Sequence, residues 1–81
     1  MCTIPVIDIR ATGLNIARLR TAAGLTVRDL QDVFGFVNPQ TIYKWQNGLC
    51  LPSLDNLVIL AAALGVTLDE ILVYQDRNGI N

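Results

Sequence analysis

The sequence predicts an all-α fold: a compact bundle of five short helices, preceded by a short extended N-terminal arm. The chain has only 81 residues, which is enough for one small domain. Hydrophobic residues make up 52% of it and charged residues 16%, so the chain can bury a core and is not a disordered tail. Helix-capping residues and glycines recur at close intervals and divide the chain into five segments with helical periodicity.

The first two predicted helices are separated by a turn that contains glycine. The first spans about Gly13 to Ala23, and Gly24 suits the left-handed position that follows a helix end. The second is about two turns long; it begins at Thr26, which has capping-box spacing to Asp29, and it ends at Gly35. The apolar side chains that we expect to face the core are Ile16, Leu19, Leu30, Val33 and Phe34.

The third predicted helix is short and has one polar face. Asn38 provides an N-cap, and Pro39 is pre-set for the first helical position. Ile42 and Trp45 share a face, so we expect Trp45 to be a core residue, and Asn47-Gly48 ends the helix. The polar side chains that this arrangement directs away from the core are Gln40, Thr41 and Lys44.

The last two predicted helices close the bundle. One begins at Pro52 and Ser53 and stops at Gly65, and its apolar residues predict the most buried helix of the five. The other begins with a second capping box, formed by Thr67 and Glu70. The apolar residues are Leu54, Leu57, Val58, Leu60, Ala61 and Leu64 in the former helix, and Leu68, Ile71 and Leu72 in the latter.

The N-terminal segment Ile4 to Ile9 is rich in β-branched residues and too short for a helix. Two interpretations stay open. The segment either packs its apolar side chains on the bundle, or it pairs as a strand, with Val73 to Gln75 or with a second subunit. We therefore divide the chain into an N-terminal arm (1–11), a helical domain (12–74) and a C-terminal tail (75–81).

The composition argues against an enzyme, a metalloprotein and a membrane protein. The chain has no histidine, the commonest general base, and Cys2 and Cys50 are too few for a zinc site or a disulfide framework. The apolar run Leu57 to Leu68 is too short to cross a bilayer, and residues 1–10 lack the pattern of a secretion signal. We expect a cytoplasmic, non-enzymatic protein with no metal or other cofactor, in which Cys50 is partly buried.

The charge is unevenly distributed along the chain. The formal net charge of -1 and the isoelectric point near 4.9 argue against non-specific attraction to nucleic acid. Residues 10–48, however, contain five basic and two acidic residues, whereas residues 49–81 contain one basic and four acidic residues. The basic part includes the second and third predicted helices.

Two short helices joined by a tight turn form the arrangement that lets the second helix enter the major groove of DNA. The Gln40 amide can bond to the edge of adenine, Lys44 can donate to guanine or phosphate, and the Thr41 methyl group can contact that of thymine. An ordinary amphipathic helix also presents polar side chains to solvent. These three residues alone therefore leave both interpretations open.

An ordered series of short elements covers about residues 13 to 73. Its members are Leu19-Arg20, Gly24-Leu25-Thr26, Leu30, Gly35, Ile42, Trp45-Gln46-Asn47-Gly48, Pro52-Ser53, Leu57, Leu60, Leu64-Gly65-Val66 and Asp69. This order resembles the phage-repressor-like (Cro/Xre) helix-turn-helix family, whose members are mostly dimeric DNA-binding transcriptional regulators. The resemblance implies a five-helix fold in which residues 12–74 form the helix-turn-helix DNA-binding domain.

The resemblance also implies a DNA-contacting surface. The start of the third helix would read bases, and the backbone amides at the starts of the second and third helices would hold phosphates. The expected base-contacting residues are Pro39, Gln40, Thr41, Tyr43 and Lys44, with covering of the helix edge as an equal alternative for Tyr43. The expected phosphate-contacting residues are Thr26, Arg28, Asn38 and Asn47.

Three features depart from the family pattern. The turn at residues 36–39 is one residue longer than usual, which would rotate the third helix and shift the contacts by one position. Gln46 replaces a glutamate that pairs with the arginine of the first helix, so we expect Arg20 to keep a hydrogen bond, lose a charge pair and act structurally. The arm at Ile4 to Ile9 has no counterpart in the family pattern.

We expect a sequence-specific double-stranded DNA-binding regulator that acts as a homodimer on a palindromic operator, with the third helix in the major groove. The alternative is an antitoxin or protein-interaction adaptor on the same fold with weak DNA affinity, for which the acidic isoelectric point argues. The expected partners are accordingly DNA, a second copy of the chain and, in the alternative, another protein.

Overall fold

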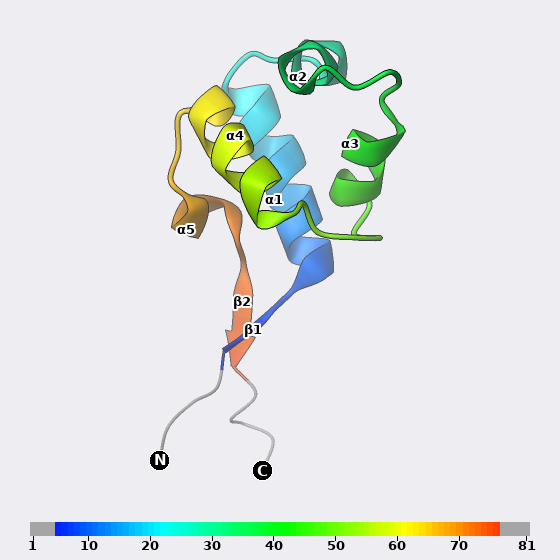
Figure 1. Ribbon diagram of the computed structural model, residues 1–81. Coiled ribbons are helices and arrows are strands. Elements are labelled where there is room, and N and C mark those ends of the chain that lie inside the picture. Colours follow the sequence, from blue (N-terminus) through cyan, green and yellow to red (C-terminus); the bar gives the residue numbers. More distant parts are fainter. Residues whose placement is uncertain (1–4, 77–81) are drawn as a thin grey trace.

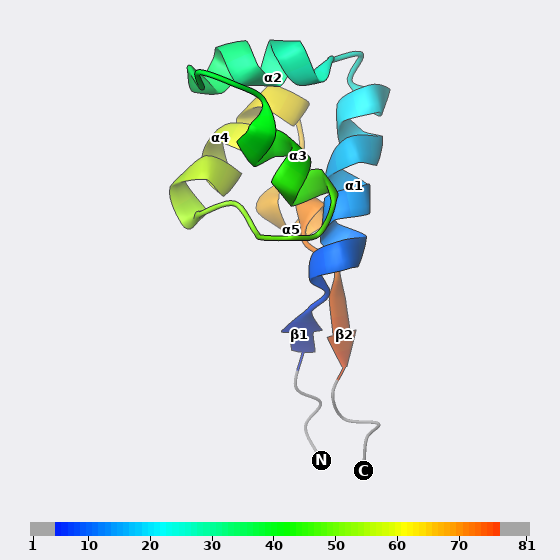
Figure 2. The same ribbon diagram turned by 90° about the vertical axis from the view of Figure 1, so that its right-hand side faces the viewer.

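The computed structural model describes residues 5–76, which form five helices and one small sheet (Figure 1). The elements in chain order are β1 (Pro5–Ile7), α1 (Ile9–Ala22), α2 (Val27–Phe34), α3 (Gln40–Gln46), α4 (Leu54–Leu64), α5 (Leu68–Ile71) and β2 (Tyr74–Asp76). The predicted five-helix bundle is confirmed, with two strands in addition. Helix α2 crosses one end of α1, and the sheet extends from the other end (Figures 1 and 2).

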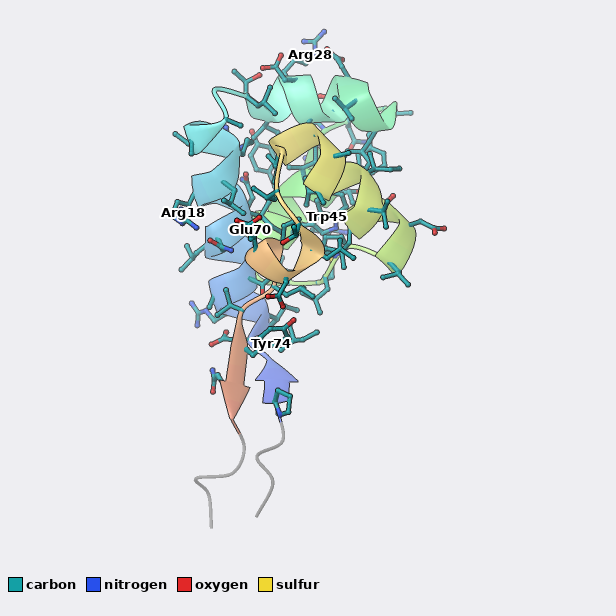
Figure 3. All side chains as sticks on the ribbon, turned by 90° about the vertical axis from the view of Figure 1, so that its left-hand side faces the viewer. Arg18, Arg28, Trp45, Glu70 and Tyr74 are labelled. Atoms are coloured by element: carbon teal, nitrogen blue, oxygen red, sulfur yellow. The ribbon has the colours of Figure 1, made fainter. Side chains whose placement is uncertain are left out.

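The core lies between the helices and receives side chains from all five of them. Its buried members are Ile16, Leu30, Ile42, Trp45, Leu57, Leu60, Ala61, Leu64 and Ile71. Trp45 is 2% exposed and lies in the middle of the bundle (Figure 3), which confirms its prediction as a core residue. The rings of Phe34 and Phe36 pack edge-to-face against it, with centroid distances of 5.3 and 6.0 Å. The indole therefore joins α3 to α2 and to the turn between them.

Helix α1 and the end of α3 touch through their backbones at Gly13. A Cβ atom at this position would lie 2.8 Å from the carbonyl oxygen of Gln46 and closer still to that of Trp45. A second close contact lies just after α3, where a Cβ atom on Gly48 would lie 2.9 Å from the Cα atom of Arg10 in the first turn of α1. No larger residue fits at either position without moving α3 away from α1.

The predicted capping boxes are both present. At the start of α2, the Thr26 hydroxyl accepts a bond from the Asp29 amide at 3.0 Å, and the Asp29 carboxylate accepts one from the Thr26 amide at 2.8 Å. The same pair of bonds joins Thr67 and Glu70 at 3.2 and 2.9 Å before α5. As predicted, α2 ends at Gly35 and α4 ends at Gly65.

The prediction that the first helix begins near Gly13 is wrong, because α1 begins at Ile9. Residues 9–11, expected in the arm, form its first turn. The Asp8 side chain accepts a bond from the Ala11 amide at 3.0 Å and supplies the N-cap. This bond, followed by one from the Gln75 side chain, lowers the pKa of Asp8. Gly13 lies inside the helix, where contact with α3 requires it.

Three residues predicted for the core are exposed. The exposed fraction is 52% for Val33, 70% for Leu54 and 55% for Val58. In α2, the inward residues Val27, Leu30 and Phe34 lie within about 60° of one another, whereas Val33 lies about 100° from Phe34. In α4, Val58 lies about 100° from Leu57, whereas Leu54 lies within about 20° of buried Ala61 but is the first residue of the helix, beyond the packed part of the core. Helices α2 and α4 thus carry more apolar side chains than the bundle buries.

The N-terminal arm pairs as a strand with the segment near Gln75, which was one of the two interpretations left open. The strands are antiparallel, with the register Pro5↔Asp76, Val6↔Gln75 and Ile7↔Tyr74. Their junction with the bundle is fixed by the buried Thr12, whose hydroxyl accepts a bond from the Val73 amide at 3.0 Å. The fold therefore joins the two ends of the described chain.

The contact at Gly13 predicts that Gly13→Ala lowers the free energy of unfolding. In an exposed helix this change would stabilise by about 1 kcal/mol, but overpacking here should outweigh that and cost about 1–3 kcal/mol. Urea unfolding followed by circular dichroism would measure the effect. The control is Leu14→Ala at the neighbouring, 69% exposed position, which should stay within about 0.5 kcal/mol. A more stable Gly13→Ala variant would contradict the close packing.

Candidate nucleic-acid interface

Helices α2 and α3 are held at a fixed angle by the turn at residues 35–39. The Phe36 amide donates to the Gln31 carbonyl at 3.1 Å, and the Gln31 side-chain amide donates to the carbonyls of Phe36 and Val37 at 3.2 Å each. Gln31 thereby supports the turn between α2 and α3. The Asn38 side chain accepts a bond from the Gln40 amide at 3.0 Å, and regular helix begins at Gln40, one position later than predicted.

Helix α3 lies on the surface and packs on the bundle with one side only (Figure 2). Ile42 and Trp45 face inward. At 100° per residue, Gln40 and Lys44 lie opposite them, at the middle of the outer face. Tyr43 lies beside these two and is 43% exposed. The outer face of α3 thus combines an amide, an ammonium group and a phenol.

Four other expected contact residues lie around this outer face. Asn47, directly after α3, is exposed, as is Asn38 in the turn, while Pro39 and Thr41 are partly buried. The structure therefore brings together the residues expected to read bases with two of those expected to hold phosphates. Thr41 is at the edge of the face and not at its middle, because it lies about 100° from both Gln40 and Ile42.

Thr26 and Arg28 lie at the start of α2. The Thr26 hydroxyl is engaged in the capping box, and the Thr26 backbone amide is the main cause of the lowered pKa of Asp29, followed by its hydroxyl. Arg28 projects from the end of the molecule that carries α2 (Figure 3). Its 3.6 Å ion pair with Asp32 joins two strongly exposed side chains, so it leaves the guanidinium available to another anion.

Arg20 joins α1 to α3 and does not face the outer surface. Its Nε donates to the Gln46 side-chain oxygen at 2.9 Å, and an Nη atom donates to the Leu25 carbonyl at 2.7 Å. The predicted hydrogen bond without a charge pair is confirmed. Arg20 therefore serves the fold by fixing the end of α3 relative to the turn before α2.

The basic residues of the first half are not all on one side. Arg18 bonds to Asn15, whose amide donates to the carbonyls of Glu70 and Ile71, so this arginine lies on the side of α1 that packs against α5. Arg10, by contrast, lines a surface hollow with Leu14, Gln46 and Asn47 at the end of α3. Its contact with Gly48 depends on the fold of residues 46–48, and the sequence pattern carried no signal for it. Among the described residues, Arg10 and Lys44 thus lie at α3, and Arg28 lies at the start of α2.

Other kinds of site find little support in residues 5–76. Within that range, no three histidine, cysteine or acidic side chains are close enough to hold a metal ion. None of the helices formed there has the length and apolar character needed to cross a membrane. Cys50 is exposed and not partly buried as expected, because the segment between α3 and α4 runs along the surface. Cys2 lies outside the described residues.

The chain is similar to known proteins in both sequence and structure. The family model described as helix-turn-helix matches residues 16–71. The structure is similar to that of the restriction-modification controller protein C.AhdI from Aeromonas hydrophila, with 30% sequence identity, a TM-score of 0.70, and coverage of 79% of this chain and 96% of that one. It also shares its fold with the clp gene regulator ClgR from C. glutamicum, with 24% identity, a TM-score of 0.66, and coverage of 76% and 79%. No curated protein sequence matches significantly.

The neutral bond between Arg20 and Gln46 predicts that Gln46→Glu stabilises the fold. A charge-assisted bond is about 1 kcal/mol stronger than a neutral one, so the free energy of unfolding at pH 7 should rise by about that amount. Arg20 would hold the folded-state pKa of the new carboxylate below its unfolded value of about 4.3. The gain should therefore be complete above that pH and disappear as the pH falls through the folded-state pKa.

Urea unfolding at pH 7 and pH 3 would measure this effect. Gln46→Ala, which removes the acceptor, is the matched control and should destabilise at both pH values. An equal stability of Gln46→Glu and the parent at pH 7 would show that Arg20 does not bond to residue 46 in solution.

Proposed function

This chain belongs to the phage-repressor-like (Cro/Xre) helix-turn-helix family, and we propose that it regulates transcription by binding a specific double-stranded DNA sequence as a homodimer. The family consists of DNA-binding regulators and not of enzymes. The observation that carries the proposal is the outer face of α3, where Gln40, Tyr43 and Lys44 are exposed while Ile42 and Trp45 hold the helix from behind.

In this proposal α3 enters the major groove. Gln40 and Lys44 lie at the middle of the outer face, so they reach base edges first: the amide bonds to adenine, and the ammonium group bonds to guanine. Tyr43 and Thr41 lie on either side and contact the walls of the groove or neighbouring bases. Pro39 is next to the first helical residue and packs against the base or sugar there.

Phosphate contacts would fix the position of α3 in the groove. Thr26 and Arg28 at the start of α2 meet one stretch of backbone, while Asn38 and Asn47 flank α3 at its two ends. The side-chain amide of Asn38 keeps its N–H donors free, since it uses its oxygen to bond to Gln40. Arg10 joins this set because it borders Asn47 in the surface hollow.

The regulatory role is supported by the 30% identical C.AhdI, which is a controller protein. One helix of seven residues reads too few base pairs for useful specificity, so we propose two copies on a palindromic operator. Repression is the simplest outcome of such binding, because a dimer that occupies an operator blocks other proteins without needing a further surface. A DNA-independent adaptor role remains the outcome if no DNA sequence is selected.

The first test removes the two central side chains of α3. Gln40→Ala and Lys44→Ala should each weaken binding to the preferred site by about 1–3 kcal/mol, or about fivefold to 150-fold, with little change in thermal stability. The site would first be selected from random double-stranded DNA, and affinities then measured by fluorescence anisotropy at one salt concentration. Arg18→Ala is the control, because it removes a cation on the side that faces α5.

Unchanged affinity of Gln40→Ala would show that the register of α3 in the groove is wrong. Failure of the parent protein to select any sequence would overturn the proposed function itself.

The second test is the salt dependence of binding. Among the described residues, Arg10 and Lys44 at α3 and Arg28 at the start of α2 give three cations per subunit on the proposed contact surface, so a dimer would neutralise about six phosphates. The slope of log K against log salt concentration should then be about -5. Anisotropy titrations at several salt concentrations would give the slope, and Arg18→Ala should leave it unchanged. A slope near -10 would mean that the contact surface extends far beyond this set.

A further inference from the structure

The two-stranded sheet is largely exposed to solvent. All three residues of β1 are exposed, including Val6 and Ile7 at 40% each, and Tyr74 on β2 is 47% exposed. The Tyr74 hydroxyl donates a hydrogen bond to the Asp69 carboxylate at 3.1 Å, and this bond raises the pKa of Tyr74. The same bond connects one end of β2 to α5. An isolated pair of three-residue strands is at best marginally stable in water, and further strands would stabilise it.

The hydrogen-bonding pattern shows which groups the sheet leaves available. The Asp8 amide donates to the Val73 carbonyl at 2.7 Å, so with the observed register Val6 and Gln75 form the bonded pair between the strands. The backbone groups of the alternate residues therefore point outward. On β2 these are the N–H and C=O groups of Tyr74 and Asp76, for which the described residues 5–76 provide no backbone partner.

The two outer edges differ in their capacity to pair. The β1 edge is interrupted by Pro5, which has no N–H group to donate. The β2 edge presents two donors and two acceptors in regular alternation. If two β2 edges meet in antiparallel orientation, Tyr74 of each lies opposite Asp76 of the other, and all four donors find acceptors. The β2 edge is thus complementary to itself.

We propose that β2 pairs with β2 of a second copy, centred on Gln75, to form a four-stranded sheet in the order β1–β2–β2–β1. Such an interface is two-fold symmetric, as expected for a homodimer. Neutral Gln75 faces its own copy at the axis, so no like charges meet there. The pairing itself does not depend on the proposed function. Only its consequence rests on that function, namely that the pairing fixes the position of the two α3 helices relative to DNA.

The orientation of the sheet suits a shared DNA surface. The two-fold axis between antiparallel strands is perpendicular to the sheet. In Figure 2, where α3 faces the viewer, β1 and β2 lie side by side, whereas in Figure 1 they overlap. The sheet normal therefore points in the direction in which α3 is exposed. Rotation by 180° about this axis keeps both α3 helices on the same face of the dimer.

The distance between the sheet and α3 also suits DNA. Val6 lies beside Gln75 in the sheet, so the path to α3 can be followed from Val6 to Gly13. The chain advances about 7 Å in extended conformation up to Asp8, and then about 7 Å along α1 up to Gly13. The end of α3 contacts Gly13, and the middle of α3 lies about 4 Å further from the sheet. Along the strand direction, the two α3 helices would thus be about 36 Å apart, close to the spacing of about 34 Å between half-sites one turn apart.

The decisive experiment is disulfide crosslinking of the free protein, without DNA. In a Cys2→Ser, Cys50→Ser background, Gln75→Cys should form a covalent dimer under mild oxidation. Its Cα atom would be about 4.5 Å from that of its copy in a non-hydrogen-bonded pair, which is within the range for a disulfide. Non-reducing gel electrophoresis would measure the yield, with at least a tenfold excess expected over the control.

The matched control is Val6→Cys in the same background. Val6 is the direct partner of Gln75 and lies on the same face of the sheet, but its own copy would be three strand spacings away, about 14 Å. Equal crosslinking of both variants would overturn the β2 pairing. So would efficient crosslinking of Val58→Cys on the exposed face of α4 together with none at Gln75→Cys, which would place the interface on α4.

A second measurement uses the edge amide directly. Tyr74→Pro removes the outward N–H group without touching the bonded pair Val6–Gln75, and it should raise the dimer dissociation constant at least tenfold in sedimentation equilibrium. Tyr74→Val removes the same ring but keeps the amide, and it should have a much smaller effect. Equal effects of the two substitutions, with helix content unchanged, would contradict pairing through the edge. Neither outcome depends on DNA, so a protein that pairs through β2 but selects no DNA sequence would refute the proposed function alone.

Discussion

The contact between the backbones of α1 and α3 at Gly13 is the constraint on which the rest of the structure depends. It sets how deeply the end of α3 lies against α1, because carbonyl oxygens of α3 occupy the space of a missing side chain. At this depth Trp45 reaches the rings of Phe34 and Phe36, which join α3 to α2. The same depth leaves the opposite side of α3 in solvent, so the packing of the core and the presentation of the polar face have one cause.

The bond from Arg20 to Gln46 supports this arrangement from the other side. A glutamate at residue 46 would attract the arginine more strongly, but the amide still accepts the bond, and the second bond to the Leu25 carbonyl fixes the guanidinium. Arg20 is thereby removed from the set of cations that can meet DNA. Together with the position of Arg18 beside α5, this explains why two of the five basic residues within residues 10–48 are not part of the proposed contact surface.

The parts of the fold that the sequence predicted depend on residues close together in the chain. The two capping boxes join residues three apart, and Ile42 and Trp45 share a face of one short helix. The errors arise where distant segments decide. Gly13 resembles a helix boundary in the sequence, but it is a contact point for α3, more than thirty residues later. Leu54 and Val58 fit the apolar pattern of their helix, but the pattern could not show that both side chains stay exposed, because that depends on which other elements pack there. The outward position of Gln40 and Lys44 followed from helical spacing, whereas Arg10 reached the site through the fold alone.

The bond from the Val73 amide to the Thr12 hydroxyl has a consequence for the order in which the protein folds. The two residues are 61 positions apart, and the strands beyond them are separated by nearly the whole described chain. Closing so long a loop in the unfolded chain costs conformational entropy that three residue pairs cannot offset. The intervening helices must therefore assemble first and bring the two ends together. The sheet forms last and opens first, so its presence reports that the rest of the chain has already folded.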